Sequence, residues 1–159
     1  MASNSKQNQT LAGVAGASVA AWLLAFTPTQ EGLKLYGYLD PVGIATKCYG
    51  DTRAVVLGHR YSKEECKASL DGRLAEAAEG VIRCVPGAKT KPGPLSASID
   101  FSYNAGVGAF CKSKMAKDFN QQAWGTGCKE FGKWIYAKGQ VLPGLVTRRE
   151  AEMKKCLEG

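Results

Sequence analysis

The sequence predicts a mostly helical α+β fold with a small β-hairpin. Three observations carry this prediction. Aromatic and β-branched residues flank a strong turn signal, Asp-Pro-Val-Gly, at residues 40–43. Residues 63–84 carry one apolar stripe at helical spacing, and further helical stretches follow between residues 94 and 157. A chain of 159 residues suits one globular domain, or two small lobes that share a helix.

The net charge of +7 indicates an anionic partner. Nucleic acid is one candidate, but the lysines and arginines are scattered singly and form no basic run. A dispersed positive field suits an anionic cell wall or membrane surface, and we expect no nucleic-acid partner.

The six cysteines are widely spaced and contain no C-x-x-C pair, and His59 is the single histidine. A zinc site is therefore not expected. The even count favours three disulfides in an oxidising compartment, and buried free thiols are the alternative.

Residues 11–27 are an apolar, Ala-rich run inside a stretch that carries no charge from residue 7 to residue 30. Seventeen residues lie at the lower limit for a membrane-spanning helix, and the Ala/Gly content makes insertion marginal. A cleavable signal peptide and a buried amphipathic helix are the rivals. Ala25-Phe26-Thr27 is a poor cleavage site and Pro28 follows it. We favour a weak, uncleaved signal anchor over residues 1–27.

Glu31 follows this run by four residues, and Asp40 occupies the first position of the hairpin turn. Two carboxyls that face one cleft, one protonated and one ionised, are what glycoside hydrolysis needs. Spacing alone favours a plainer interpretation, in which Glu31 is a solvated residue at a helix end and Asp40 caps its own turn.

Further along, residues 51–61 are a turn-rich loop in which His59 is expected at the surface rather than in catalysis. Ser62 and Glu65 form a capping box, and Val85-Pro86-Gly87 ends the long helix near Cys84. Helices are then expected over residues 95–104, 113–120, 124–137 and 147–157, with residues 139–144 as a break. The aromatic residues of this region are expected in the core: Phe101, Phe119, Trp124, Phe131 and Trp134.

Three groups of residues carry a resemblance to a known family. Glu31-Gly32 followed by Tyr38-x-Asp40-x-x-Gly43-x-x-Thr46 resembles the active-site signature of phage lysozymes, the endolysins of glycoside hydrolase family 24. The resemblance extends over about residues 28–157 and includes residues 101–108 (FSYNAGVG) and 142–150 (LPGLVTRRE). Just past Thr46 the chain departs from many relatives, since Lys47-Cys48-Tyr49-Gly50 replaces a glycine-rich stretch.

The resemblance implies a lysozyme-like fold with a catalytic domain over residues 28–159. It divides this domain into a hairpin lobe at about 28–61, a linking helix at about 63–84 and a helical lobe at about 94–159.

It also implies the roles of the site residues. Glu31 is the general acid, with a pKa raised by apolar packing. Asp40 stabilises the oxocarbenium-like charge and helps orient a water molecule that Thr46 holds. Tyr103 and Asn104 face the cleft from the far lobe, and Arg148 or Arg149 approaches the glutamate. No cofactor or metal is implied.

The expected activity is that of an inverting muramidase, which hydrolyses the β-1,4 bond between N-acetylmuramic acid and N-acetylglucosamine in peptidoglycan during host lysis. A lytic transglycosylase and a non-enzymatic cationic wall-binding protein are the alternatives. The Ala/Gly-rich run resembles the anchors of signal-anchor-release endolysins. It implies a protein held on the periplasmic side of the host inner membrane and later released into the periplasm. We expect the protein to be a monomer.

The cysteines can be paired from their places in the predicted elements. Cys48 on the return strand lies near Cys66 in the first turn of the long helix, so a 48–66 bridge is expected. Cys84 at the helix end is paired with Cys111. Cys128 and Cys156 then join the last two helices, although six cysteines allow fifteen pairings.

Overall fold

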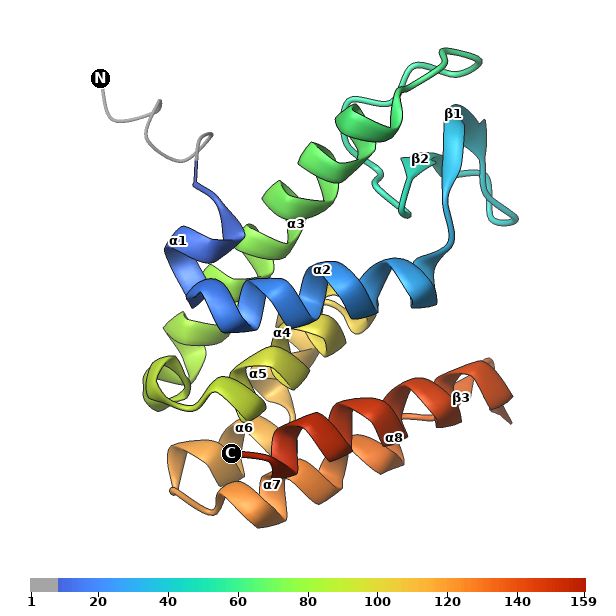
Figure 1. Ribbon diagram of the computed structural model, residues 1–159. Coiled ribbons are helices and arrows are strands. Elements are labelled where there is room, and N and C mark those ends of the chain that lie inside the picture. The colour runs from blue at the N-terminus through green and yellow to red at the C-terminus, as the bar shows by residue number, and fades with distance from the viewer. Residues whose placement is uncertain (1–8) are drawn as a thin grey trace.

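The computed structural model describes residues 9–159, and Figure 1 shows their arrangement. Within these residues the chain is mostly helical, with two small antiparallel sheets, β1-β2 and β3-β4. The first sheet lies beside the N-terminal end of the long helix α3, and helices α4 to α8 gather below the other end of α3 (Figure 1). This architecture confirms the predicted mostly helical α+β fold with a small β-hairpin.

The apolar N-terminal run is folded into the body of the protein as two helices, α1 (Leu11–Ala15) and α2 (Ala17–Glu31). Gly16 separates them because its φ of 91° lies in the left-handed region that favours glycine. Helix α1 packs against α3, and α2 packs against α4. Four apolar side chains of this run are buried in the hydrophobic core: Leu11, Val19, Ala20 and Leu23.

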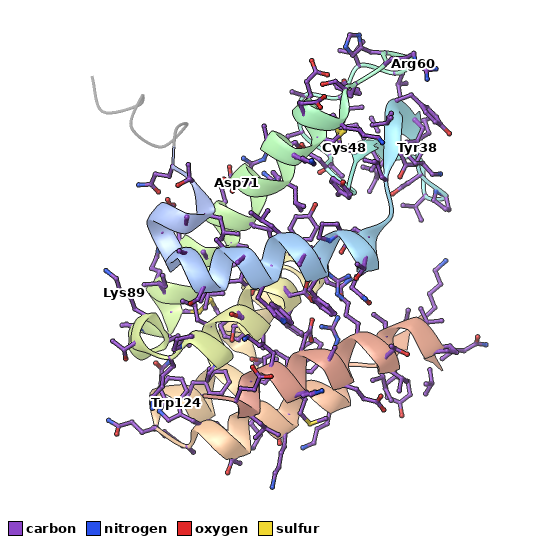
Figure 2. The ribbon with its side chains drawn as sticks, in the orientation of Figure 1. Tyr38, Cys48, Arg60, Asp71, Lys89 and Trp124 are labelled. Atoms are coloured by element: carbon purple, nitrogen blue, oxygen red, sulfur yellow. A yellow bond between two sulfur atoms is a disulfide. The ribbon has the colours of Figure 1, made fainter. Side chains whose placement is uncertain are left out.

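The start of α1 is fixed from two sides. Thr10 is its N-cap, and the Thr10 hydroxyl accepts a hydrogen bond from Gly13 N–H. The Leu11 N–H donates to Asp71 Oδ2 of α3 at 3.1 Å, and Figure 2 shows Asp71 on the part of α3 beside α1. None of the helices formed by residues 9–159 has both the length and the apolar character needed to cross a membrane.

The predicted hairpin is present as β1 (Lys34–Leu39) and β2 (Ala45–Cys48). Its turn is held by Asp40, whose Oδ1 accepts hydrogen bonds from the N–H groups of Val42 and Ile44 at 3.0 and 2.8 Å. The loop that follows runs back along β1, where Gly37 allows a close approach. A Cβ atom at Gly37 would lie 2.2 Å from the Val56 carbonyl oxygen.

Helix α3 (Lys63–Cys84) begins at the predicted capping box, in which Ser62 and Glu65 bond reciprocally. Its apolar stripe is buried as expected, including Cys66, Leu70, Leu74 and Val81. The helix therefore links the hairpin region to the helical lobe through one continuous packed face.

The helical lobe is built around α4 (Pro92–Ala105), which is buried along most of its length. Around it lie η1 (Pro86–Thr90), α5 (Val107–Lys112), α6 (Lys114–Asn120), α7 (Trp124–Glu130), η2 (Phe131–Lys133) and α8 (Pro143–Leu157). Phe101, Phe119 and Phe131 are fully buried, as predicted, whereas Trp134 is 39% exposed.

Two predicted boundaries in this lobe are wrong. The helix expected over residues 124–137 ends at Glu130, and β3 (Tyr136–Ala137) pairs with β4 (Gln140–Val141). Lys138 and Gly139 both have positive φ, which is typical of a two-residue hairpin turn. The last helix begins at Pro143 rather than at residue 147, because proline is well suited to the first helical position.

The three predicted disulfides are confirmed. Cys48 bonds to Cys66, Cys84 to Cys111 and Cys128 to Cys156. Figure 2 shows the bond at Cys48 between the hairpin and α3. Cys48 has a φ of 57°, so the return strand ends in a left-handed turn. The bridge holds this irregular end of β2 against α3.

Candidate active site

Glu31 is the last residue of α2, directly before Gly32, whose φ of 69° turns the chain toward the hairpin. Its side chain is 18% exposed. Glu31 Oε1 accepts a hydrogen bond from Arg148 Nη1 of α8 at 2.6 Å. The predicted acid therefore lies in a half-buried position where three parts of the fold meet: α2, the hairpin and α8.

Burial raises the pKa of Glu31, because a carboxylate loses hydration inside the protein. The charge and hydrogen bond of Arg148 oppose this effect, and the charge of Asp100 adds to it. The net direction is upward. A raised pKa is the property that a carboxylic acid needs in order to donate a proton at a working pH where free glutamate is ionised.

Arg148 joins Glu31 to a second, fully buried carboxylate. Its Nε donates to Asp100 Oδ2 at 2.9 Å and its Nη2 donates to Asp100 Oδ1 at 3.0 Å. The planar guanidinium thus binds Asp100 through one edge and Glu31 through Nη1. Of the two arginines predicted near the glutamate, Arg148 is the one that contacts it.

Arg149 faces a different set of groups. Its Nη1 donates to both oxygens of Glu152 at 2.6 and 2.5 Å, and its Nε donates to the Trp134 carbonyl at 3.0 Å. Its Nη2 donates to Asn104 Oδ1. Arg149 therefore holds Asn104 in place rather than touching Glu31.

A cleft of about 680 Å³ opens in front of Glu31. Tyr103 and Asn104 line it from the end of α4, as predicted. The Tyr103 hydroxyl donates to the Tyr49 carbonyl at 2.5 Å, which ties the helical lobe to the loop after β2. Burial and the nearby charge of Glu31 raise the pKa of Tyr103, so this hydroxyl keeps its proton. Charged side chains also line the cleft: Arg53, Arg73, Glu76 and Arg83.

Asp40 and Thr46 lie in the hairpin rather than in this cleft wall. Among the described residues that line the cleft, neither appears. Asp40 caps its own turn, and the buried Thr46 hydroxyl donates to the Ile44 carbonyl at 2.9 Å. Both residues therefore have structural partners, and Glu31 is the predicted catalytic residue that the cleft includes.

Sequence reasoning missed Asp100 and Glu152, which are both fully buried. Two signals were present. Asp100 is the only charged residue between Lys91 and Lys112, and a lone acid among uncharged, partly apolar residues of a helix needs a buried partner. Glu152 lies four residues after Arg148 and three after Arg149, the spacings that place side chains on one helix face.

Burial would raise the pKa of Asp100, but hydrogen bonds from Glu152, Arg148 and Thr27 outweigh it and hold that pKa below its usual range. Glu152 shows the opposite result, since burial and the neighbouring Asp100 raise its pKa well above normal. The ionised Asp100 is therefore the fixed negative charge beside Arg148.

Within residues 9–159 we find no cluster of three or more His, Cys, Asp and Glu side chains placed to hold a metal ion. His59 is exposed, and its ring contacts that of Tyr61 edge-on.

The phage lysozyme family model matches residues 28–152. The chain belongs to the phage lysozyme family. A SAR-endolysin of Enterobacteria phage PA-2 is 39% identical over 134 residues, which cover 81% of this chain and 78% of that protein. A SAR-endolysin of Bacteriophage PS34 is 33% identical over 162 residues, covering 96% of this chain and 95% of that protein.

Among solved structures, the active form of P1 phage endolysin Lyz matches with a TM-score of 0.74 at 22% identity, covering 98% of this chain and 87% of Lyz. This match supports the fold. The family model and the relatives named as SAR-endolysins confirm the predicted resemblance to phage endolysins of the signal-anchor-release type. The phage lysozyme family makes the chain a lysozyme-type glycoside hydrolase.

Proposed function

We propose that this phage lysozyme is a muramidase that hydrolyses the β-1,4 bond between N-acetylmuramic acid and N-acetylglucosamine in peptidoglycan, and so lyses the host cell. The observation that carries the proposal is Glu31: a half-buried carboxyl with a raised pKa at the wall of a cleft. The net charge of +7 favours binding to an anionic wall polymer.

In the proposed reaction, protonated Glu31 donates its proton to the glycosidic oxygen as the bond from that oxygen to the sugar carbon breaks. Asp40 stabilises the positive charge that develops on the sugar and orients water, which Thr46 helps to hold. Among the described residues, Asp40 Oδ2 accepts no protein hydrogen bond, and this oxygen is the one we assign to the water. Attack from the opposite face gives inversion, for which the carboxyls should be about 6.5–9.5 Å apart.

The test is the release of soluble fragments from purified peptidoglycan by wild type, Glu31→Gln and Asp40→Asn. Each variant should lose at least about two orders of magnitude in rate while staying folded, because general acid catalysis alone contributes about 10²–10⁴-fold. Glu150→Gln is the matched control, since Glu150 is exposed on α8. Wild-type turnover in either variant would remove that residue from the mechanism.

Mass spectrometry of the fragments separates the alternatives. Hydrolysis adds one water and leaves a reducing sugar, whereas a lytic transglycosylase leaves an anhydro sugar. A non-enzymatic wall-binding protein would release no fragments and would keep its full effect as Glu31→Gln.

We further propose that residues 1–27 first lie in the host inner membrane, with residues 28–159 as a silent catalytic domain on its periplasmic side. On release the run folds onto α3 and α4, and the enzyme acts as a monomer in the periplasm without a nucleic-acid partner. The uncharged run at residues 7–30 and its packing in the folded protein support these two locations. The relatives named as SAR-endolysins support them as well.

A further inference from the structure

Thr27 is the residue of the apolar N-terminal run whose side chain reaches the buried charges beside Glu31. It lies one helical turn before Glu31 on α2 and is fully buried. The Thr27 hydroxyl donates to Asp100 Oδ1 at 2.8 Å. A polar contact between an apolar segment and a buried carboxylate on α4 needs a reason beyond packing.

Asp100 shares its two oxygens among several donors. Oδ1 accepts from Thr27 and from Arg148 Nη2, and Oδ2 accepts from Arg148 Nε. A hydrogen bond with Glu152 also stabilises the charged carboxylate. Each donor satisfies part of the carboxylate charge. Thr27 and Arg148 therefore share one oxygen atom of Asp100 as their acceptor.

Arg148 is itself shared, because its Nη1 donates to Glu31 Oε1 at 2.6 Å. The guanidinium is planar and rigid, so a shift toward Asp100 changes its contact with Glu31. Asp100 and Glu31 thus compete for one cation, and Thr27 acts on one side of this competition.

We propose that Thr27 is a positioning residue for Glu31: through Asp100, its hydroxyl sets how the Arg148 guanidinium is shared between Asp100 and Glu31. The inference rests on the proposed role of Glu31 as the catalytic acid. Thr27 belongs to the run that packs against α4, so the hydroxyl reaches Asp100 only when this run is docked. One hydrogen bond therefore links docking of the N-terminal run to the protonation of the acid.

Other titratable and charged groups lie around Glu31. The charge of Arg149 on α8 lowers the pKa of Glu31, and Tyr103 lies near Glu31 on α4. Glu152 of α8 lies beside Arg148 and Asp100. The cleft is also lined by Arg53 of the loop after β2 and, on α3, by Arg73, Glu76 and Arg83. Replacement of Thr27 changes none of these charges.

The decisive comparison is Thr27→Val with Thr27→Ser in the full chain. Valine keeps the shape of threonine without its hydroxyl, whereas serine keeps the hydroxyl and loses a methyl group. Without the hydroxyl, Asp100 draws Arg148 away from Glu31, and the alkaline limb of the kcat/KM profile on peptidoglycan should move up by about half a pH unit, a threefold change in proton affinity. Thr27→Ser should keep the wild-type limb. If Thr27 acted through packing alone, Thr27→Val would keep the wild-type limb and Thr27→Ser would change it.

Asp100→Asn should shift the alkaline limb in the direction opposite to that expected for Thr27→Val. It releases Arg148 to Glu31 and removes a negative charge that raises the pKa of Glu31, so the alkaline limb should move down. Thr27→Val added to Asp100→Asn should cause no further shift, because its route through Asp100 is gone. If Asp100→Asn does not fold, the comparison of Thr27→Val with Thr27→Ser still tests the proposed role of Thr27.

Thr29→Val is the matched control, since the Thr29 hydroxyl donates to the Phe26 carbonyl on the exposed side of α2 and should leave the profile unchanged. An unchanged alkaline limb in Thr27→Val, with Glu31→Gln inactive, would overturn this inference alone. An active Glu31→Gln would instead overturn the proposed function.

Discussion

Arg148 Nη1 lies 2.6 Å from Glu31 Oε1, although the two residues are 117 positions apart in the chain. This contact joins the end of α2 to the last helix, α8. It also restrains the acid, because Arg148 opposes the rise in the pKa of Glu31 that burial causes. The pKa of Glu31 thus depends on two opposing effects, the desolvation of its carboxylate and the charge of Arg148, which Glu31 shares with Asp100.

Replacing Arg148 with lysine should disturb this balance. Lysine keeps the charge but lacks the planar fork, so it cannot bind Asp100 through two nitrogens and reach Glu31 as well. We expect kcat to fall about tenfold or more, and the melting temperature to fall because a buried ion pair is weakened. Steady-state kinetics and thermal unfolding measure both effects. Arg60→Lys, at an exposed loop position, is the control and should change neither.

The N-terminal run offers a matched pair of leucines. Leu23 is 0% exposed in the core and Leu24, the next residue, is 41% exposed. Leu23→Ala should cost about 2–5 kcal/mol in the free energy of unfolding, whereas Leu24→Ala should cost much less. Chemical denaturation of the purified full chain measures both. Equal, small effects would show that the run does not belong to the folded core.

The bridge between Cys48 and Cys66 closes a loop with a sequence separation of 18 residues. Replacing both cysteines with serine should lower the free energy of unfolding by about 3 kcal/mol, from the loop-closure entropy alone. Activity should fall as well, because this bridge holds the return strand of the hairpin against α3. Cys128 and Cys156 are not among the residues that line the cleft, so removing the bridge between them should reduce stability but keep kcat at low temperature. Loss of kcat in both double variants would contradict a specific role for the hairpin bridge.

The membrane location can be tested without damage to the folded enzyme. Ala17, Ser18 and Ala21 are exposed on α2, so leucine at these three positions leaves the core intact. Each leucine favours the bilayer by about 0.3–0.6 kcal/mol, and the triple variant should stay in the inner membrane and fail to lyse cells. The same variant, purified and refolded, should cleave peptidoglycan like wild type. Lysis at the wild-type rate would show that membrane tethering does not restrain the enzyme.

Much of the fold could be predicted because its signals are local. The turn at Asp40 and the capping box at Ser62 each lie within a few residues and need no distant partner. The helix expected over residues 124–137 ends early because residues 136–137 pair with residues 140–141 in a hairpin around the Lys138-Gly139 turn.

The site was harder to predict than the fold. The motif predicted Glu31 as the catalytic acid. Which of Arg148 and Arg149 contacts Glu31 depends on the rotation of α8 relative to α4, and residue spacing in the sequence does not specify this rotation. Asp100 and Thr27 are 73 positions apart in the sequence, and their hydrogen bond forms only when α2 packs against α4.

The most direct measurement is a titration of the Glu31 carboxyl carbon by NMR in the folded full chain, with Glu31→Gln used to assign the signal. We predict a midpoint above the ordinary glutamate pKa of about 4.3 and above those of the exposed glutamates. The midpoint should fall in Asp100→Asn. A Glu31 midpoint at or below that of the exposed glutamates would contradict its role as the proton donor.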